Sequence, residues 1–97
     1  MDNPAHKQAI ENFQSEIASC RMKLEEALTD INQETIPNVI GLDATISDIC
    51  SRIEKSPPVV AHALKYELKE MLSLAEELVM SVENLRDTLV KRAETSH

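Results

Sequence analysis

The sequence predicts an all-α protein, on the strength of its composition and the spacing of its apolar residues. The 97-residue chain has one glycine, no tryptophan, one phenylalanine and one tyrosine, whereas 42% of its residues are hydrophobic. Sheets favour aromatic residues and need turn glycines, so this mixture suits helices that pack through aliphatic seams. Apolar residues also recur at intervals of three and four, the period of one helix face. A chain of this length forms one domain, so we expect a single helical domain over 1–97.

The first predicted helix spans about residues 4–32 and begins where Asn3 precedes Pro4. A small polar residue followed by proline is a frequent helix start, because proline lacks only an N–H that has no partner there. Leu28 widens the stripe of apolar residues along this segment. The stripe consists of Ile10, Phe13, Ile17, Cys20, Leu24, Ala27 and Ile31.

The second predicted helix spans about residues 37–55, although Gly41 is a weak helix former and leaves a start at Asp43 as an alternative. Its stripe consists of Val39, Leu42, Ile46, Ile49 and Ile53, with Cys50 alongside. The short linker before Pro37 fits an antiparallel turn or a kink, and we favour the turn. The turn would make Cys20 and Cys50 neighbours, as two small core residues or, alternatively, as a disulfide.

The third predicted helix spans about residues 57–94, with Ser56 as its N-cap, and is the longest. Leu72 and Val79 form a second apolar row beside its main stripe, and a second row favours a bundle over a two-stranded coiled coil. We therefore predict a three-helix bundle, or a bent helical hairpin, with a long C-terminal helix. The main stripe consists of Leu64, Leu68, Met71, Ala75, Leu78, Val82, Leu85 and Leu89.

Charge and hydropathy exclude several functions. The formal net charge of −7 argues against nucleic acid, which requires a concentrated face of lysine and arginine. Excess acid favours solubility or the docking of a basic partner. No apolar run is long enough to span a membrane, and the first twenty residues lack a signal-peptide core. We expect a cytoplasmic protein without a membrane association.

The sequence predicts a protein that is not an enzyme and holds no cofactor or metal, because it shows no phosphate loop, nucleophile arrangement or ligand cluster. One stretch carries an alternative. His62, Leu64 and Lys65 resemble the histidine-containing phosphotransfer motif His-x-Leu-Lys-Gly. That resemblance implies that His62 accepts a phosphoryl group and that Lys65 helps to neutralise it. The motif glycine is replaced here by Tyr66.

A second resemblance covers more of the chain. The sequence from Ile53 to Pro58, followed by a long helix with Leu68, Leu78, Leu85 and Leu89 and with Arg86 and Arg92 near its end, is similar to the flagellar type III export chaperones of the filament-cap type. These are short, cytosolic helical proteins that bind C-terminal segments of secreted flagellar subunits. The resemblance implies a binding surface on the second and third helices, and the residues that it singles out are Leu68, Met71, Leu78, Val82 and Leu85.

Three further residues are apolar but lie off the main stripe of the third segment. Tyr66, Leu74 and Met80 form a candidate docking strip on the side away from the core. Together these patterns favour a non-enzymatic protein-binding module, an export chaperone or adaptor that masks a helical or basic segment of another protein. The length of the third helix leaves apolar surface uncovered, which predicts a homodimer as well.

Overall fold

The computed structural model describes residues 4–35, 37 and 39–95. In this part of the chain it has helices and no strand, which confirms the all-α prediction. The helices are α1 (Pro4–Asn32), α2 (Leu42–Glu54), α3 (Pro58–Ala63) and α4 (Lys65–Thr95). The molecule is a rod about 69 Å long and 19 × 18 Å across. No helix among the described residues is both long and apolar enough to cross a membrane.

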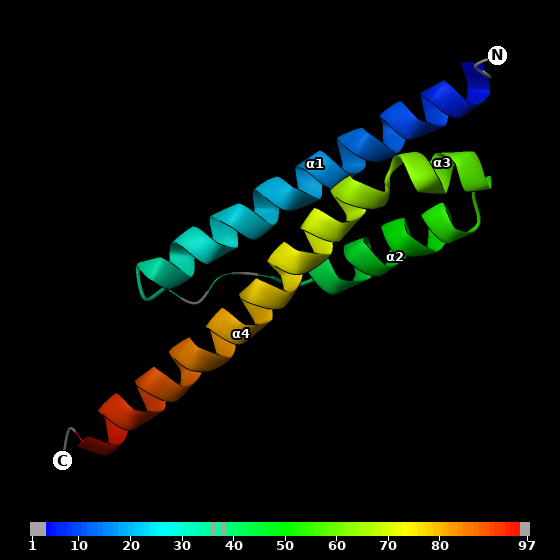
Figure 1. Cartoon of the computed structure of the whole chain (residues 1–97). Coiled ribbons are helices and arrows are strands. Elements are labelled where there is room, and N and C mark those ends of the chain that lie inside the picture. The colour runs from blue at the N-terminus through cyan, green and yellow to red at the C-terminus, as the bar shows by residue number, and fades with distance from the viewer. Residues whose placement is uncertain (1–3, 36, 38, 96–97) are drawn as a thin grey trace.

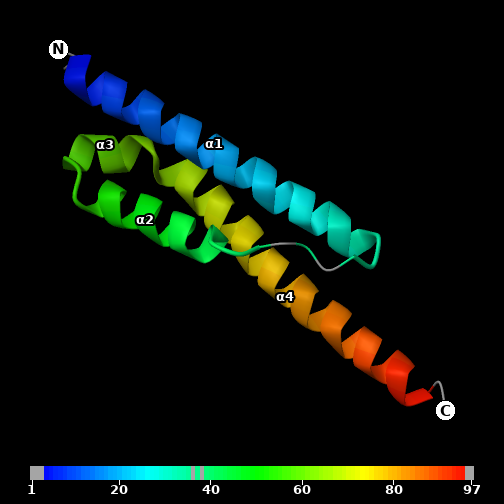
Figure 2. The same ribbon diagram turned by 180° about the vertical axis from the view of Figure 1, so that it is seen from behind.

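The helices lie lengthwise along the rod (Figures 1 and 2). α1, α3 and α4 run in the same direction, and α2 runs against them. α1 packs along α4 and also contacts α2 and α3. The antiparallel arrangement of the first two helices is therefore confirmed, but the connection over residues 33–41 is longer than a tight turn. The C-terminal half of α4 extends beyond α2, towards the opposite end of the rod from the N-terminus.

The core is a continuous cluster that all four helices supply, and its members match the predicted stripes closely. Leu28 and Cys50 pack against it, as the second apolar row predicts. Leu72 and Val79, which the sequence also placed in that row, are instead exposed. Val60 is buried without having been predicted. The buried cluster consists of Ile17, Cys20, Leu24, Ala27, Ile49, Ile53, Val60, Leu64, Met71 and Leu78.

The predicted third helix is divided into α3 and α4 at Leu64. The backbone of Leu64 has φ −97° and ψ 0°, so it leaves the helical region while its N–H still bonds to the carbonyl of Val60 at 3.2 Å. The bend buries Val60 and Leu64 completely. The predicted N-cap at Ser56 is wrong, because its hydroxyl donates back to the carbonyl of Ile53 at the end of α2. The predicted N-cap Asn3 lies outside the described residues.

The second helix begins at Leu42, five residues after the predicted start. Gly41 precedes it at φ 84°, a left-handed conformation that glycine adopts without a steric penalty. Its carbonyl accepts hydrogen bonds from the backbone and the hydroxyl of Thr45, both at 3.0 Å. Pro37 is buried in the connection and not in a helix. The alternative of a late helix start, caused by Gly41, therefore describes the structure better than a start at Pro37.

α1 ends in a Schellman motif, the paired hydrogen bonds that close many helix C-termini. Thr35 N–H bonds to the carbonyl of Asp30 at 2.8 Å, and Glu34 N–H bonds to that of Ile31 at 2.9 Å. Glu34 occupies the left-handed position, at φ 60°, where glycine is usual. Its carboxylate accepts two hydrogen bonds of 2.7 Å from Arg92 of α4. These bonds lower the pKa of the Glu34 carboxyl and raise that of the Arg92 guanidinium.

Arg52 fastens α2 to α1. Its guanidinium donates to both carboxylate oxygens of Glu16 on α1 and to Asp48 one turn earlier on α2. It also lies 5.5 Å from the ring centroid of Phe13, a cation–π distance. Hydrogen bonding to Glu16, and secondarily to Asp48, raises the pKa of Arg52. A planar, forked side chain is needed for this set of contacts.

Candidate functional site

Most of the α4 positions that the export-chaperone resemblance singles out lie inside the chain's own core. Met71 is completely buried, and Leu78 and Leu85 are nearly so. Leu68 and Val82 are half-buried and pack against the core. These side chains hold α4 against the rest of the molecule, and Met71 and Leu85 in particular offer little surface to another protein.

The predicted docking strip is divided by the structure. Tyr66 and Met80 are exposed, whereas Leu74 packs partly against the core. Tyr66 and Leu74 both line a shallow hollow between α1 and α4, and Met80 is not among its lining residues. An ion pair of 3.0 Å between Arg21 and Glu70 joins the two helices at this hollow. The strip is therefore two separate features instead of one continuous surface.

His62 and Lys65 are both exposed, but they belong to different helices. His62 lies in the last turn of the six-residue α3, and Lys65 is the first residue of α4. Leu64 breaks the helical path between them. The two side chains therefore do not share the continuous helix face that the phosphotransfer resemblance implies.

The two cysteines are free, and both adjoin the core between α1 and α2. Desolvation raises the pKa of the Cys20 thiol, an effect that Lys23 partly opposes and Cys50 increases. Cys20 belongs to the core cluster and Cys50 packs against the same cluster, as the antiparallel arrangement predicts. Desolvation also raises the pKa of Cys50 itself. Among the described residues, no group of three or more histidine, cysteine or acidic side chains could hold a metal ion.

A groove of about 280 Å³ with a largely apolar lining lies between α2 and α4, and we call it the α2–α4 groove. Leu24 and Leu78 are core residues that line it, so its floor is the hydrophobic core itself. Val39 and Val79 stand at its edges and are exposed. The remaining lining residues are Leu42, Asp43, Ile46, Ala75, Val82, Glu83 and Arg86.

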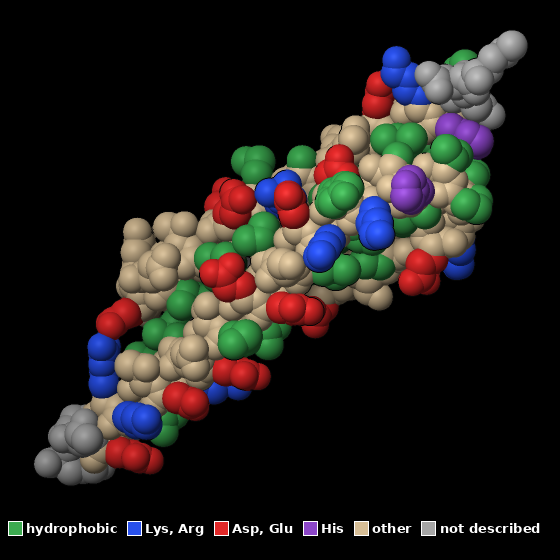
Figure 3. All heavy atoms as spheres, viewed as in Figure 1, with side chains coloured by type: hydrophobic (Ala, Val, Ile, Leu, Met, Phe, Trp, Pro, Cys, Tyr) green, Lys and Arg blue, Asp and Glu red, His purple; other side chains and the backbone are tan. Residues whose placement is uncertain are grey.

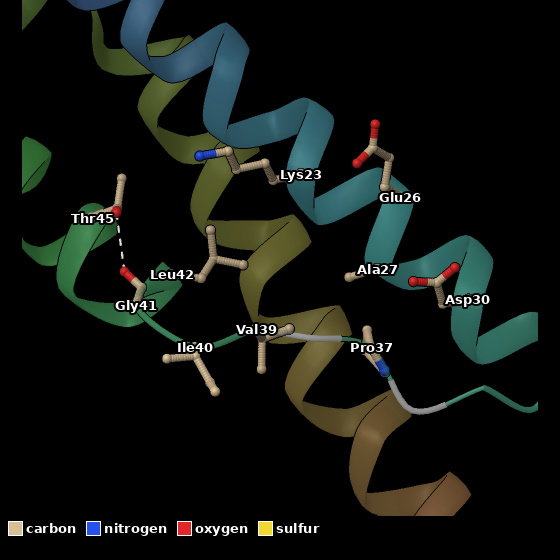
Figure 4. Close-up of a pocket in the computed structure, with 10 residues that line it drawn as sticks. All are labelled: Lys23, Glu26, Ala27, Asp30, Pro37, Val39, Ile40, Gly41, Leu42 and Thr45. Carbon is tan, nitrogen blue, oxygen red and sulfur yellow. Dashed lines mark hydrogen bonds between the residues drawn. The ribbon is translucent and has the colours of Figure 1, made fainter.

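A second opening, of about 300 Å³, is lined by α1, the connection between α1 and α2, and the start of α2 (Figure 4). Val39 and Leu42 line both openings. The second one has charged side chains from α1 at its rim, among them Lys23 and Asp30. In Figure 4 the side chain of Ile40 points away from α1, and it is 95% exposed. The connection thus presents two apolar residues, Val39 and Ile40, next to the α2–α4 groove.

The groove was missed in the sequence because its residues carry the same spacing as core residues. Val79 lies seven residues after Leu72 and was assigned to the second apolar row of the core, yet its side chain is 56% exposed. The spacing of apolar residues does not say which of them the chain itself covers. Ile40 has no helical spacing, and its position beside Gly41 was the one signal of an exposed apolar loop residue.

The surroundings of the groove are acidic. α4 has no lysine or arginine between Lys69 and Arg86, and α2 has none before Arg52. Asp43 and Glu83 line the groove. Figure 3 shows acidic side chains interspersed with hydrophobic ones along the half of the rod that α4 forms.

No family model, curated protein or solved structure matches this chain.

Proposed function

We propose that the chain is a non-enzymatic protein-binding module that holds a helical segment of a partner in the α2–α4 groove. The observation that carries the proposal is an apolar groove floored by the core and edged by the exposed side chains of Val39 and Val79. Exposed apolar surface that is continuous with a groove favours an interaction site over scattered surface residues.

The shape of the groove favours a helix as its occupant. Ala75, Val79, Val82 and Arg86 follow one another on α4 at intervals of four, three and four residues, so they form one ridge along its length. A partner helix with apolar side chains at the same spacing can pack against such a ridge. The part of α4 that extends beyond α2 would lengthen the contact (Figure 1).

The resemblance to the export chaperones suggests the biological form of this function. A chaperone or adaptor would mask an apolar helix of its partner until that helix is needed elsewhere. Of the residues that the resemblance names, Leu78 and Val82 line the groove, whereas Leu68, Met71 and Leu85 do not. The resemblance and the proposal agree on the region, because both place the partner against the helices that follow residue 37.

Photo-crosslinking tests the proposal. A photo-reactive phenylalanine would replace either Val79 or Met80 in the source cells, and the adducts would be identified by mass spectrometry. The positions are adjacent on α4 and comparably exposed, at 56% and 64%, but they point about 100° apart. We expect one defined protein, crosslinked through a helical segment, from position 79 only. Adducts from position 80 alone would place the partner on the outward face of α4 that carries Met80. Adducts from neither position would refute the proposal.

The phosphotransfer alternative keeps one supporting observation, which is the exposure of the His62 side chain. Incubation with acetyl phosphate or a kinase donor would give an acid-labile phosphate that is lost in His62→Ala. If no phosphate forms with several donors, this alternative is removed.

A further inference from the structure

The charges around the α2–α4 groove bear on the identity of its occupant. Asp43 stands on the α2 side of the groove and Glu83 on the α4 side. Glu76 lies three residues before Val79 and seven before Glu83, so it shares their face of α4. Arg86 is the one basic residue that lines the groove, and it lies furthest along α4. The rim is therefore acidic over most of its length.

None of these three acidic side chains forms an ion pair within the described part of the chain. The ion pairs found there join Arg21 to Glu70, Arg52 to Glu16 and Asp48, and Arg92 to Glu34. Each of these pairs fixes the fold or a helix end. Asp43, Glu76 and Glu83 take part in none of them, which leaves their carboxylates available to a bound partner.

We infer that the occupant of the groove is an amphipathic helix of another protein whose apolar stripe is flanked by lysine or arginine. This inference rests on the proposed function. Basic side chains on both edges of the stripe would meet Asp43 on one wall and Glu76 and Glu83 on the other. Such complementarity selects partners and accelerates their association more than it adds raw affinity.

A second copy of the chain fits this groove poorly. Each copy has a formal net charge of −7, and pairing groove to groove would bring Asp43 and Glu83 of both copies together. Like charges that face each other across an interface oppose association. The homodimer that the sequence suggested is therefore disfavoured at this surface relative to a basic helix.

Three synthetic peptides of about 20 residues, the length of a five- to six-turn helix, test the inference. One has a leucine stripe flanked by lysine, the second has the same stripe flanked by glutamate, and the third has the lysines with the leucines scrambled. Binding would be measured by fluorescence anisotropy at physiological salt. We expect the first peptide to bind about tenfold more tightly than either of the others. Its advantage over the glutamate-flanked peptide should shrink at high salt, because that advantage is electrostatic.

Two protein variants locate the effect. Glu83→Lys should remove most of the preference for the lysine-flanked peptide. Glu77→Lys makes the same charge change on the same helix, but Glu77 lines the shallow hollow between α1 and α4. The preference for the lysine-flanked peptide should therefore persist in this variant. Equal effects of the two variants would mean that overall charge and not the groove governs binding, which would overturn the inference.

The outcomes separate this inference from the proposed function. If the two striped peptides bind equally and Val79→Ser weakens both, the groove binds helices without a charge preference, and only the inference fails. If the scrambled peptide binds as tightly as the striped one, the occupant is not an amphipathic helix, and the inference also fails. If no striped peptide binds in a manner that depends on Val79, both the proposed function and the inference are refuted.

Discussion

Two adjacent residues of α4 should respond very differently to truncation. Leu78 is 5% exposed and belongs to the core, whereas its neighbour Val79 is 56% exposed at the edge of the groove. Leu78→Ala removes three buried carbons, at about 0.8 kcal/mol each. Because the site opens on the groove, water can enter the vacated space, so we expect a loss of about 2–3 kcal/mol, near the low end for buried leucines.

Val79→Ala should leave stability almost unchanged. Less than half of the valine surface is covered, and alanine gains back about 0.5 kcal/mol in helix propensity. The total free energy of unfolding of a domain of this size is about 5–15 kcal/mol. Each kcal/mol lost lowers its melting temperature by about 4–8 °C. In thermal unfolding followed by far-UV circular dichroism, the melting temperatures of the two variants should therefore differ by about 10–20 °C. Urea unfolding should rank the variants in the same order. Equal losses would show that Leu78 and Val79 are not divided between core and groove.

Three further predictions concern the contacts that hold the helices together. Arg92 lowers the pKa of the Glu34 carboxyl, so their pairing should stabilise the fold fully above the unfolded glutamate pKa of about 4.3. This stabilisation should be lost as the pH falls through the lower pKa of the folded state, and Glu34→Gln should flatten that acid dependence in unfolding curves. Arg52→Lys keeps the positive charge but loses the two-pronged contact with the Glu16 carboxylate, so hydrogen exchange of the α2 amides should accelerate. An unchanged exchange rate would contradict the conclusion that Arg52 holds α2 against α1. Burial raises the pKa of Cys20 and Cys50, so both should react slowly with a thiol reagent at about pH 8 and much faster in denaturant; fast labelling of the folded protein would contradict their burial.

The core could be predicted from the sequence because burial and helical spacing are the same signal here. Ile17, Cys20, Leu24 and Ala27 are separated by three or four residues, and all of them are buried. One helix face that repeats for several turns has few alternatives to packing against another helix. The all-α class and the long C-terminal helix follow from that regularity.

The break at Leu64 could not be predicted, because the spacing of apolar residues continues through it. Leu64 and Leu68 are four residues apart whether or not the backbone between them is helical throughout, and Leu68 N–H does bond to the Leu64 carbonyl at 2.9 Å. The bend depends on tertiary packing that buries Val60 together with Leu64. Local propensity gives no indication of that choice.

The sequence also did not indicate which apolar residues of α4 are buried and which are exposed. The export-chaperone resemblance gave Met71, Leu78 and Leu85 as partner contacts, and they are among the most buried residues of α4. Substituting glutamate for Leu78 would bury a charge and unfold the protein, so lost binding in such a variant would not identify a docking surface. Exposed positions such as Val79 are the ones at which a charge can test partner binding without that ambiguity.

One end of the α2–α4 groove lies at the start of α2, which is Leu42 and not Pro37. Val39 already stands at the edge of the groove as part of the connection, so a helix that started at Pro37 would place its first turn there. Gly41 takes φ 84°, and an added Cβ would meet nothing within 4 Å. A larger residue at this position would therefore meet no steric clash with its surroundings. It would still destabilise the fold by about 1–2 kcal/mol, because a residue with a Cβ is strained in the left-handed conformation. That conformation ends the connection just before α2 begins at Leu42, so the backbone freedom of one glycine fixes the helix start beside the groove in which we place the partner.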